Sequence, residues 1–242
     1  MHDKLDHMSY LGMVLTKMNA GYEISMQSYI EDILELYRRK VKDCVTPAKL
    51  NLFTIQPSAT LTQKDRTNFH SIVVKLLYLG KRGRPDILLA VQFLCMRVKQ
   101  PNQDDLHKLE RVLGYLQMTK NRARVIDDSP FERVETFIDA AFANHADSKG
   151  QSGCMVFLGK TLVHEACKKQ NIVTKSLTEA ELVALSDYMM EGELIEELVM
   201  DLRSMMDEDL VTNVHLEHQD YMSAIAPVTK GGGKSWTKYM RS

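Results

Sequence analysis

The spacing of apolar residues changes once along this 242-residue chain, near residue 135, and that change constrains the fold more than any other feature. Before it, apolar residues recur three and four positions apart, which is typical of amphipathic helices. After it come short runs rich in β-branched and aromatic residues, followed by one long stretch of helical spacing. The fold class that we expect is α/β (α+β overall), with a mostly helical part followed by a mixed-sheet part.

The first half is predicted to begin with a β-hairpin and to continue with four helices. The hairpin turn is expected around Asn19, Ala20 and Gly21, between strands at 10–16 and 22–26. Pro85 suits the first turn of the third helix. The apolar stripes predict helices near 29–37, 64–80, 86–99 and 101–116, with a loop at 43–63.

The second half is predicted to contain three strands, a long helix and a fourth strand. The strands are expected at 136–142, 153–158, 161–166 and 211–216, the long helix from about 176 to 199, and a short helix at 220–226. The charged segment 119–134 contains Pro130 and lacks periodicity, so we interpret it as a linker. The expected domains are 1–125 and 135–242, joined by a linker at 126–134.

Charge is distributed unevenly between the two halves. Residues 1–134 carry 21 Lys and Arg against 15 Asp and Glu, a net +6, whereas residues 135–242 carry 10 against 17, a net −7. The basic half could bind phosphate groups, and the acidic half could bind a metal ion. The 4 cysteines form no paired motif, which favours reduced thiols in an intracellular protein, cytoplasmic or nuclear and not secreted. No apolar run approaches the ~20 residues of a membrane helix, so no membrane partner is expected.

Three carboxylates stand among apolar neighbours in the second half: Asp139, Glu181 and Asp220. Acids in such positions are costly to bury unless a cation or a hydrogen bond compensates them. Because carboxylate oxygens are the ligands that Mg²⁺ prefers, we interpret the three as ligands of a metal site that cleaves phosphodiesters. Each also has a structural interpretation: Asp139 as a bulge or edge residue, Glu181 as the capping-box partner of Thr178, and Asp220 as a helix N-cap.

Several short motifs resemble the Pol polyproteins of copia-type LTR retrotransposons. They are Tyr10-Leu11-Gly12, the segments 29–36, 74–79 and 109–116, Arg84-Pro85-Asp86-Ile87, Lys168-Lys169-Gln170, Thr178-Glu179-Ala180-Glu181, and Asp220 with Ser223-Ala224-Ile225. Residues 135–240 are similar to the ribonuclease H domain of those polyproteins, and residues 1–120 to the end of the reverse transcriptase before it. The resemblance implies hydrolysis of the RNA strand of RNA–DNA hybrids, with Asp139, Glu181 and Asp220 as catalytic residues that bind Mg²⁺ or Mn²⁺.

The chain departs from the family pattern at three places. Tyr221 follows Asp220 where the family has Asn, and Arg241 stands where the family has the Asp that supplies a fourth metal ligand. The chain stops one residue later, so we expect a ribonuclease H domain truncated at its C-terminus. The Tyr-x-Asp-Asp motif of the polymerase site does not occur, so polymerisation is not expected. These departures leave a second hypothesis open, a catalytically inactive transposon remnant that at most binds nucleic acid.

Basic residues are the expected contacts to an RNA–DNA hybrid or other nucleic acid. They lie in one cluster in the first half and in the motif that precedes the long helix, and they are Lys81, Arg82, Arg84, Lys168, Lys169 and Gln170. The alternative interpretation is that they are solvated helix ends and a solvated strand end. The sequence leaves the oligomeric state open.

Overall fold

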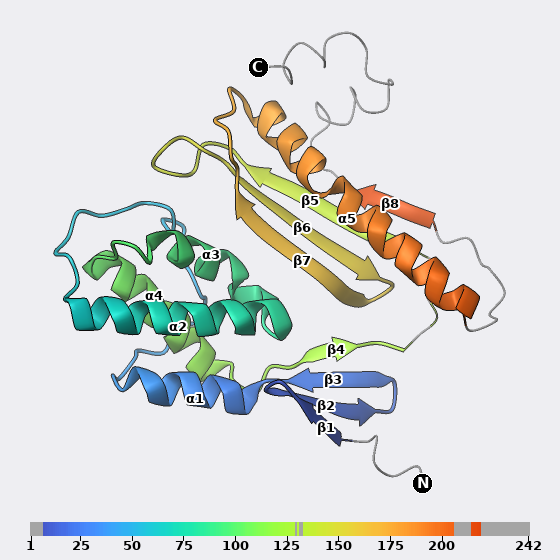
Figure 1. Ribbon diagram of the computed structural model, residues 1–242, viewed down its shortest axis with the longest axis horizontal. Helices are drawn as coiled ribbons and strands as arrows, with labels where there is room; N and C mark the ends of the chain where they lie inside the picture. The colour runs from blue at the N-terminus through green and yellow to red at the C-terminus, as the bar shows by residue number, and fades with distance from the viewer. Residues whose placement is uncertain (1–6, 129, 131–132, 206–213, 219–242) are drawn as a thin grey trace. The chain divides into compact units, whose positions relative to one another are not determined.

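The computed structural model describes residues 7–128, 130, 133–205 and 214–218. The chain divides into two compact units, Met1–Ser129 and Pro130–Ser242. Each has its own hydrophobic core. Figure 1 shows the helices and strands of both units. The mixture of helices and sheets confirms the α/β class predicted from the sequence.

The sheet of the first unit has four antiparallel strands rather than the two that were predicted. The strands are β1 His7–Tyr10, β2 Met13–Met18, β3 Gly21–Ser25 and β4 Arg124–Ile126, in the order β1-β2-β3-β4. The strand expected at 10–16 is interrupted because Leu11 and Gly12 have positive φ angles of 50° and 78° and turn the chain. Residues 124–126, which we expected in the linker, instead pair with β3.

Gly21 allows β3 and β4 to approach closely. Its φ is +110°, and a Cβ atom added there would lie 1.9 Å from the carbonyl oxygen of Ile126. A larger residue would therefore displace β4 or the start of β3. Because the partner strand lies about 100 residues away in the sequence, local spacing could not predict this pairing.

The helices of the first unit lie close to their predicted positions. They are α1 Gln27–Tyr37, α2 Gln63–Arg82, the 3₁₀ turn η1 Pro85–Ile87, α3 Leu88–Arg97 and α4 Gln103–Met118. Thr62 caps α2, and Asn102 caps α4 in a capping box with Asp105. Their apolar stripes meet in one core whose largest fully buried side chains include Ile30, Ile33, Phe69, Ile72, Leu76, Leu94, Leu109 and Leu113.

The second unit is a four-stranded mixed sheet with one long helix on one face. The strands are β5 Arg133–Ala141, β6 Gln151–Leu158, β7 Thr161–Lys169 and β8 Val214–His218, and the helix is α5 Leu177–Met205. The order is β7-β6-β5-β8, and only the β5–β8 pair is parallel among these strands. The fourth strand is described over Val214–His218, and residues 211–213 of the predicted strand lie outside the described residues. The short helix expected at 220–226 lies outside the described residues.

Alternation along β5 separates the two faces of this sheet. Val134, Thr136, Ile138 and Ala140 are buried, and Ala180, Ala184 and Leu185 of α5 share a core with three of them. The intervening residues point to the opposite face. Figure 1 shows α5 lying across β5, β6 and β8. No helix in the described part of the chain is long and apolar enough to cross a membrane.

Candidate functional site

Asp139 lies near the carboxyl end of β5, on the face opposite α5. Its neighbours Ile138 and Ala140 are 4% and 7% exposed, whereas Asp139 itself is exposed to solvent. It pairs across the sheet with Gly153 of β6, which has no side chain to cover it. The carboxylate is therefore accessible on an open sheet face, and no β-bulge disturbs the β5–β6 register.

Glu181 lies in the second turn of α5 and faces the sheet. Its side chain is 3% exposed, and it belongs to the buried stripe that continues through Ala184, Leu185 and Tyr188. The capping role expected for Thr178 and Glu181 is wrong, because α5 begins at Leu177 and Thr178 is already its second residue.

Ser176 and Glu179 make the capping contacts at the start of α5. Ser176 Oγ accepts a hydrogen bond from the Glu179 backbone N–H at 3.2 Å, and the Glu179 carboxylate accepts one from the Lys175 N–H. This pair is the Ser-x-x-Glu pattern, shifted two residues towards the N-terminus from the predicted one. Glu179 therefore serves the helix end, and Glu181 is not needed there.

Gln170 joins three elements at the end of the sheet where Asp139 lies. Its Nε2 donates to Ser152 Oγ of β6 at 3.0 Å and to the Ala180 carbonyl of α5 at 2.9 Å. Ser152 pairs with Ala140, the residue after Asp139, and Ala180 precedes Glu181. The contacts of Gln170 therefore bring the start of α5, and with it Glu181, to the same end of the sheet as Asp139.

Burial contradicts the expectation that Gln170 contacts nucleic acid. The side chain is 1% exposed, so it cannot reach a ligand from its position between β6 and α5. Gly150 leaves room for it, since a Cβ atom at residue 150 would lie 2.5 Å from Gln170 Oε1. The amide is a structural connector, and its polar character alone made it resemble a surface residue.

Gln170→Leu is expected to destabilise the second unit by about 1–3 kcal/mol, because it leaves two buried polar groups without their donor. Hydrogen exchange of peptides from β6 and from the first turn of α5 measures the effect, and both should exchange faster. Asn171→Leu is the matched control, because residue 171 is exposed and its carbonyl rather than its side chain accepts from Lys149. Equal exchange in both variants would contradict this role of Gln170.

Asp220 lies outside the described residues, but the strand before it is described. β8 runs parallel to β5, with His218 opposite Phe137, and the carboxyl ends of parallel strands meet at one edge of a sheet. Asp220 is the second residue after β8. Among the described residues, which do not include Asp220, no group of three or more His, Cys, Asp or Glu side chains could hold a metal ion.

Lys168 and Lys169 point to opposite faces at the end of β7. Lys168 Nζ lies 3.1 Å from Asp187 Oδ1 of α5 and 5.2 Å from the centre of the Tyr188 ring. Lys169 pairs with Gln151 of β6, and Gln151 pairs with Ala141 of β5. Because directly paired residues lie on the same face of a sheet, Lys169 lies on the open face with Asp139. Lys169 Nζ donates to Asp147 Oδ2 at 2.7 Å, and this hydrogen bond lowers the pKa of Asp147.

The basic residues expected to bind nucleic acid in the first unit divide into two kinds. Lys81 and Arg82 are exposed at the end of α2, with the Arg82 guanidinium 5.9 Å from the Tyr78 ring centre. Arg84 is 3% exposed and donates to Asp86 and Thr119, so its predicted contact with nucleic acid is contradicted by its burial. Only Lys81 and Arg82 of this cluster remain available.

Sequence reasoning missed an aromatic strip beside Asp139 on the open face. Phe137 is 40% exposed and stacks on the imidazole of His218, with ring centres 4.3 Å apart and planes 6° from parallel. Phe157 meets Phe137 edge-on at 5.7 Å. The two-residue spacing of Phe137 and Asp139 was the available signal, because it puts both on one face of a strand.

The chain is similar to transposon proteins and to a plant mitochondrial protein. It is 31% identical over 181 residues, or 73% of each chain, to the uncharacterized mitochondrial protein AtMg00810 of Arabidopsis thaliana. It is 30% identical over 207 residues to the retrovirus-related Pol polyprotein from transposon RE1 of the same plant, and 28% over 215 residues to that from transposon RE2. These two alignments cover 83% of the chain but only 14% of each polyprotein. No protein-family model and no solved structure matches.

Proposed function

Because this chain belongs to the family of transposon-derived, retrovirus-related Pol proteins, we propose that its second unit cleaves the RNA strand of RNA–DNA hybrids with a divalent metal ion. The observation that carries the proposal is the set of hydrogen bonds made by Gln170. Those bonds link Ala180 of α5, the residue before Glu181, to Ser152 of β6. Ser152 in turn pairs with Ala140 of β5, the residue after Asp139.

The ligand set that we propose fits a hard cation. Asp139, Glu181 and Asp220 offer only carboxylate oxygens, which suit Mg²⁺ or Mn²⁺ rather than a softer metal. Asp139 lies on the open face of the sheet and Glu181 lies on α5, which covers the other face, so a shared ion requires their carboxylates to meet beyond the end of β5. When bound, such an ion lowers the pKa of a coordinated water and offsets charge on the phosphodiester.

The open face beside Asp139 supplies groups that could hold the hybrid. Phe137 presents an exposed ring two residues before Asp139, and rings of this kind stack on bases or sugars. Lys169 lies on the same face, and its ammonium could exchange Asp147 for a backbone phosphate. Recognition of this kind depends on backbone geometry and the 2′-hydroxyl rather than on base sequence.

A second candidate is a non-catalytic remnant that binds nucleic acid. Arg241 favours it, because a cation replaces the acid that the family pattern has at that position. Such a protein would bind a hybrid through exposed basic residues such as Lys81 and Arg82, and would leave both strands intact.

The test is cleavage of a hybrid whose RNA and DNA strands carry different labels. We expect the purified chain to cut only the RNA strand in Mg²⁺ or Mn²⁺, and EDTA to stop the reaction because the carboxylates alone cannot activate water. Single-stranded RNA and duplex DNA of the same sequence should stay intact. Binding of the hybrid without cleavage in either metal would support the remnant and reject the nuclease.

A further inference from the structure

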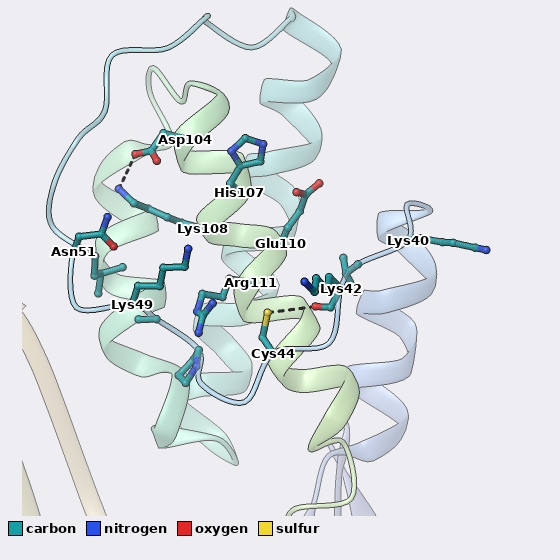
Figure 2. A pocket seen from close by; sticks show the side chains of 14 residues that line it. Lys40, Lys42, Cys44, Lys49, Asn51, Asp104, His107, Lys108, Glu110 and Arg111 are labelled. Carbon is teal, nitrogen blue, oxygen red and sulfur yellow. Dashed lines mark hydrogen bonds and ion pairs between the residues drawn. The ribbon is translucent and has the colours of Figure 1, made fainter.

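A cavity of about 390 Å³ lies in the first unit between α4 and the segment that follows α1 (Figure 2). Residues 40–52 form one wall and residues 104–111 of α4 form the other. The volume is within the range of about 300–1,000 Å³ usual for small-molecule sites. All of its lining residues belong to the first unit, whereas Asp139 and Glu181 belong to the second.

The segment that forms the first wall is fastened to α4. The Cys44 N–H donates to the Gly114 carbonyl at 3.4 Å, and Gln117 Nε2 donates to Asp43 Oδ1 at 2.6 Å. A Cβ atom at residue 114 would lie 2.0 Å from the Lys42 carbonyl oxygen, so a glycine is required for this contact. The cavity therefore has two walls held at a fixed separation.

The lining carries an excess of positive charge. Four cations contribute to it, namely Lys42, Lys49, Lys108 and Arg111, and two carboxylates, namely Asp104 and Glu110. Figure 2 shows Lys49 from the segment, and Lys108 and Arg111 from α4, lying in the space between the two walls. Lys40 also borders the cavity, but its side chain points away from it.

Both carboxylates already have partners. Asp104 Oδ2 lies 2.9 Å from Lys108 Nζ and accepts from the Gln56 N–H at 3.2 Å, while Glu110 accepts from the Tyr37 hydroxyl at 2.8 Å. The Lys49 ammonium has no hydrogen bond or ion pair with any residue that the structure describes, and only its backbone carbonyl accepts a hydrogen bond, from the Leu52 N–H. Three cations of the lining, namely Lys42, Lys49 and Arg111, therefore have no carboxylate partner among the described residues, and Lys49 and Arg111 lie on opposite walls.

Arg111 is only partly satisfied within the described residues. Its Nη2 donates to Thr46 Oγ1 at 2.7 Å, but its Nε is buried and has no hydrogen-bond acceptor there. An unpaired buried donor is costly, and an arginine held at one nitrogen can turn to present its Nε–Nη edge to an oxyanion. A phosphate between Lys49 and Arg111 would supply acceptors for both.

We propose that this cavity binds a phosphate group, carried either by a free nucleotide or by a nucleic-acid strand, with Lys49 and Arg111 as its main contacts. The cavity is larger than a single phosphate requires, which leaves room for the part of the ligand attached to it. The proposal does not depend on the nuclease activity, because binding here involves neither Asp139 nor Glu181.

The test is calorimetric titration of the full chain in EDTA, which keeps divalent metal out of the measurement. The probes are ATP, a 5′-phosphorylated eight-nucleotide DNA and the same DNA without the terminal phosphate. Lys49→Gln and Arg111→Gln are each expected to weaken binding by about tenfold or more, since each removes a charge-assisted contact. Lys40→Gln is the matched control and should bind like the unmodified chain.

The pattern of binding identifies the source of the phosphate. Binding of ATP alone assigns the cavity to a nucleotide, a preference for the phosphorylated strand assigns it to a strand end, and equal binding of both strands assigns it to backbone phosphates. Circular dichroism of the variants checks that they fold. The proposal is overturned if none of the probes binds, or if Lys40→Gln weakens binding as much as Lys49→Gln and Arg111→Gln do.

Discussion

Asp139→Asn is expected to lower the rate of RNA-strand cleavage by about 10³-fold or more, because an amide keeps the shape of the side chain but removes the charge that holds a metal. Asp139 is exposed and pairs with Gly153, so the substitution leaves the packing of the sheet unchanged. The measurement is single-turnover cleavage of the labelled hybrid in Mg²⁺. Hybrid affinity measured in Ca²⁺ should change far less than the rate.

Glu181→Gln is expected to have an effect of the same size, and the neighbouring Glu179 provides its control. Glu179 caps α5 through the Lys175 N–H, whereas Glu181 faces the sheet at 3% exposure. Glu179→Gln should therefore retain the rate and lose at most about 1 kcal/mol of stability. A chain inactivated by Glu179→Gln but not by Glu181→Gln would mean that the catalytic acid is assigned to the wrong residue.

The parts of the fold that follow from the sequence are those specified by nearby residues. The helices of the first unit were predicted because their apolar stripes and caps, such as Thr62 and Asn102, are local signals. The three consecutive strands of the second unit were predicted for the same reason, since alternation and the turn at Gly159 and Lys160 lie within a few residues.

The parts that were missed depend on partners far away in the sequence. β4 was interpreted as a linker because its pairing with β3 joins segments about 100 residues apart. Gln170 and Arg84 were interpreted as surface residues because polar side chains are usually exposed. Their acceptors, at Ala180 and Thr119, lie 10 and 35 residues away, so only the tertiary structure reveals that both side chains are buried and donate hydrogen bonds there.

The acidic site also depends on contacts between residues far apart in the sequence. The apolar surroundings of Asp139 and Glu181 were enough to propose both as ligands of one metal ion. How close they lie in the fold depends on the hydrogen bonds of Gln170, which was predicted to contact nucleic acid instead. Alternation in β5 also predicts that Asp139 faces away from α5, a consequence that becomes visible only once the face covered by α5 is known.

Loss of Arg84 is expected to destabilise the first unit strongly. Its guanidinium donates to both oxygens of Asp86, at 2.9 and 2.8 Å, and to the carbonyl and hydroxyl of Thr119, at 2.9 and 2.7 Å. It also lies 5.5 Å from the Tyr115 ring centre. These contacts connect the turn before α3 to the end of α4, so one side chain fixes two helix ends.

The carboxyl group of Asp86 responds to this arrangement. Burial opposes its ionisation, but hydrogen bonds from Arg84 and Tyr115 outweigh that effect and lower its pKa. A carboxyl whose pKa is lowered on folding stabilises the folded state above its unfolded pKa, and this stabilisation is lost as the pH falls through the folded pKa. Arg84→Leu removes the largest of the interactions that lower the pKa of Asp86, so the variant has less of this stabilisation to lose. The difference in unfolding free energy between Arg84→Leu and the unmodified chain should therefore become smaller below about pH 4.

At neutral pH, Arg84→Leu is expected to cost about 3–5 kcal/mol, because it leaves Asp86 and the Thr119 carbonyl without their cation and puts a shorter apolar side chain in its place. Urea unfolding followed by circular dichroism measures the loss. Arg82→Leu is the matched control, since Arg82 is exposed two residues earlier and its guanidinium lies over the Tyr78 ring, and it should cost no more than about 1 kcal/mol. Equal losses in the two variants would mean that Arg84 acts as a surface charge, and would restore it as a contact for nucleic acid.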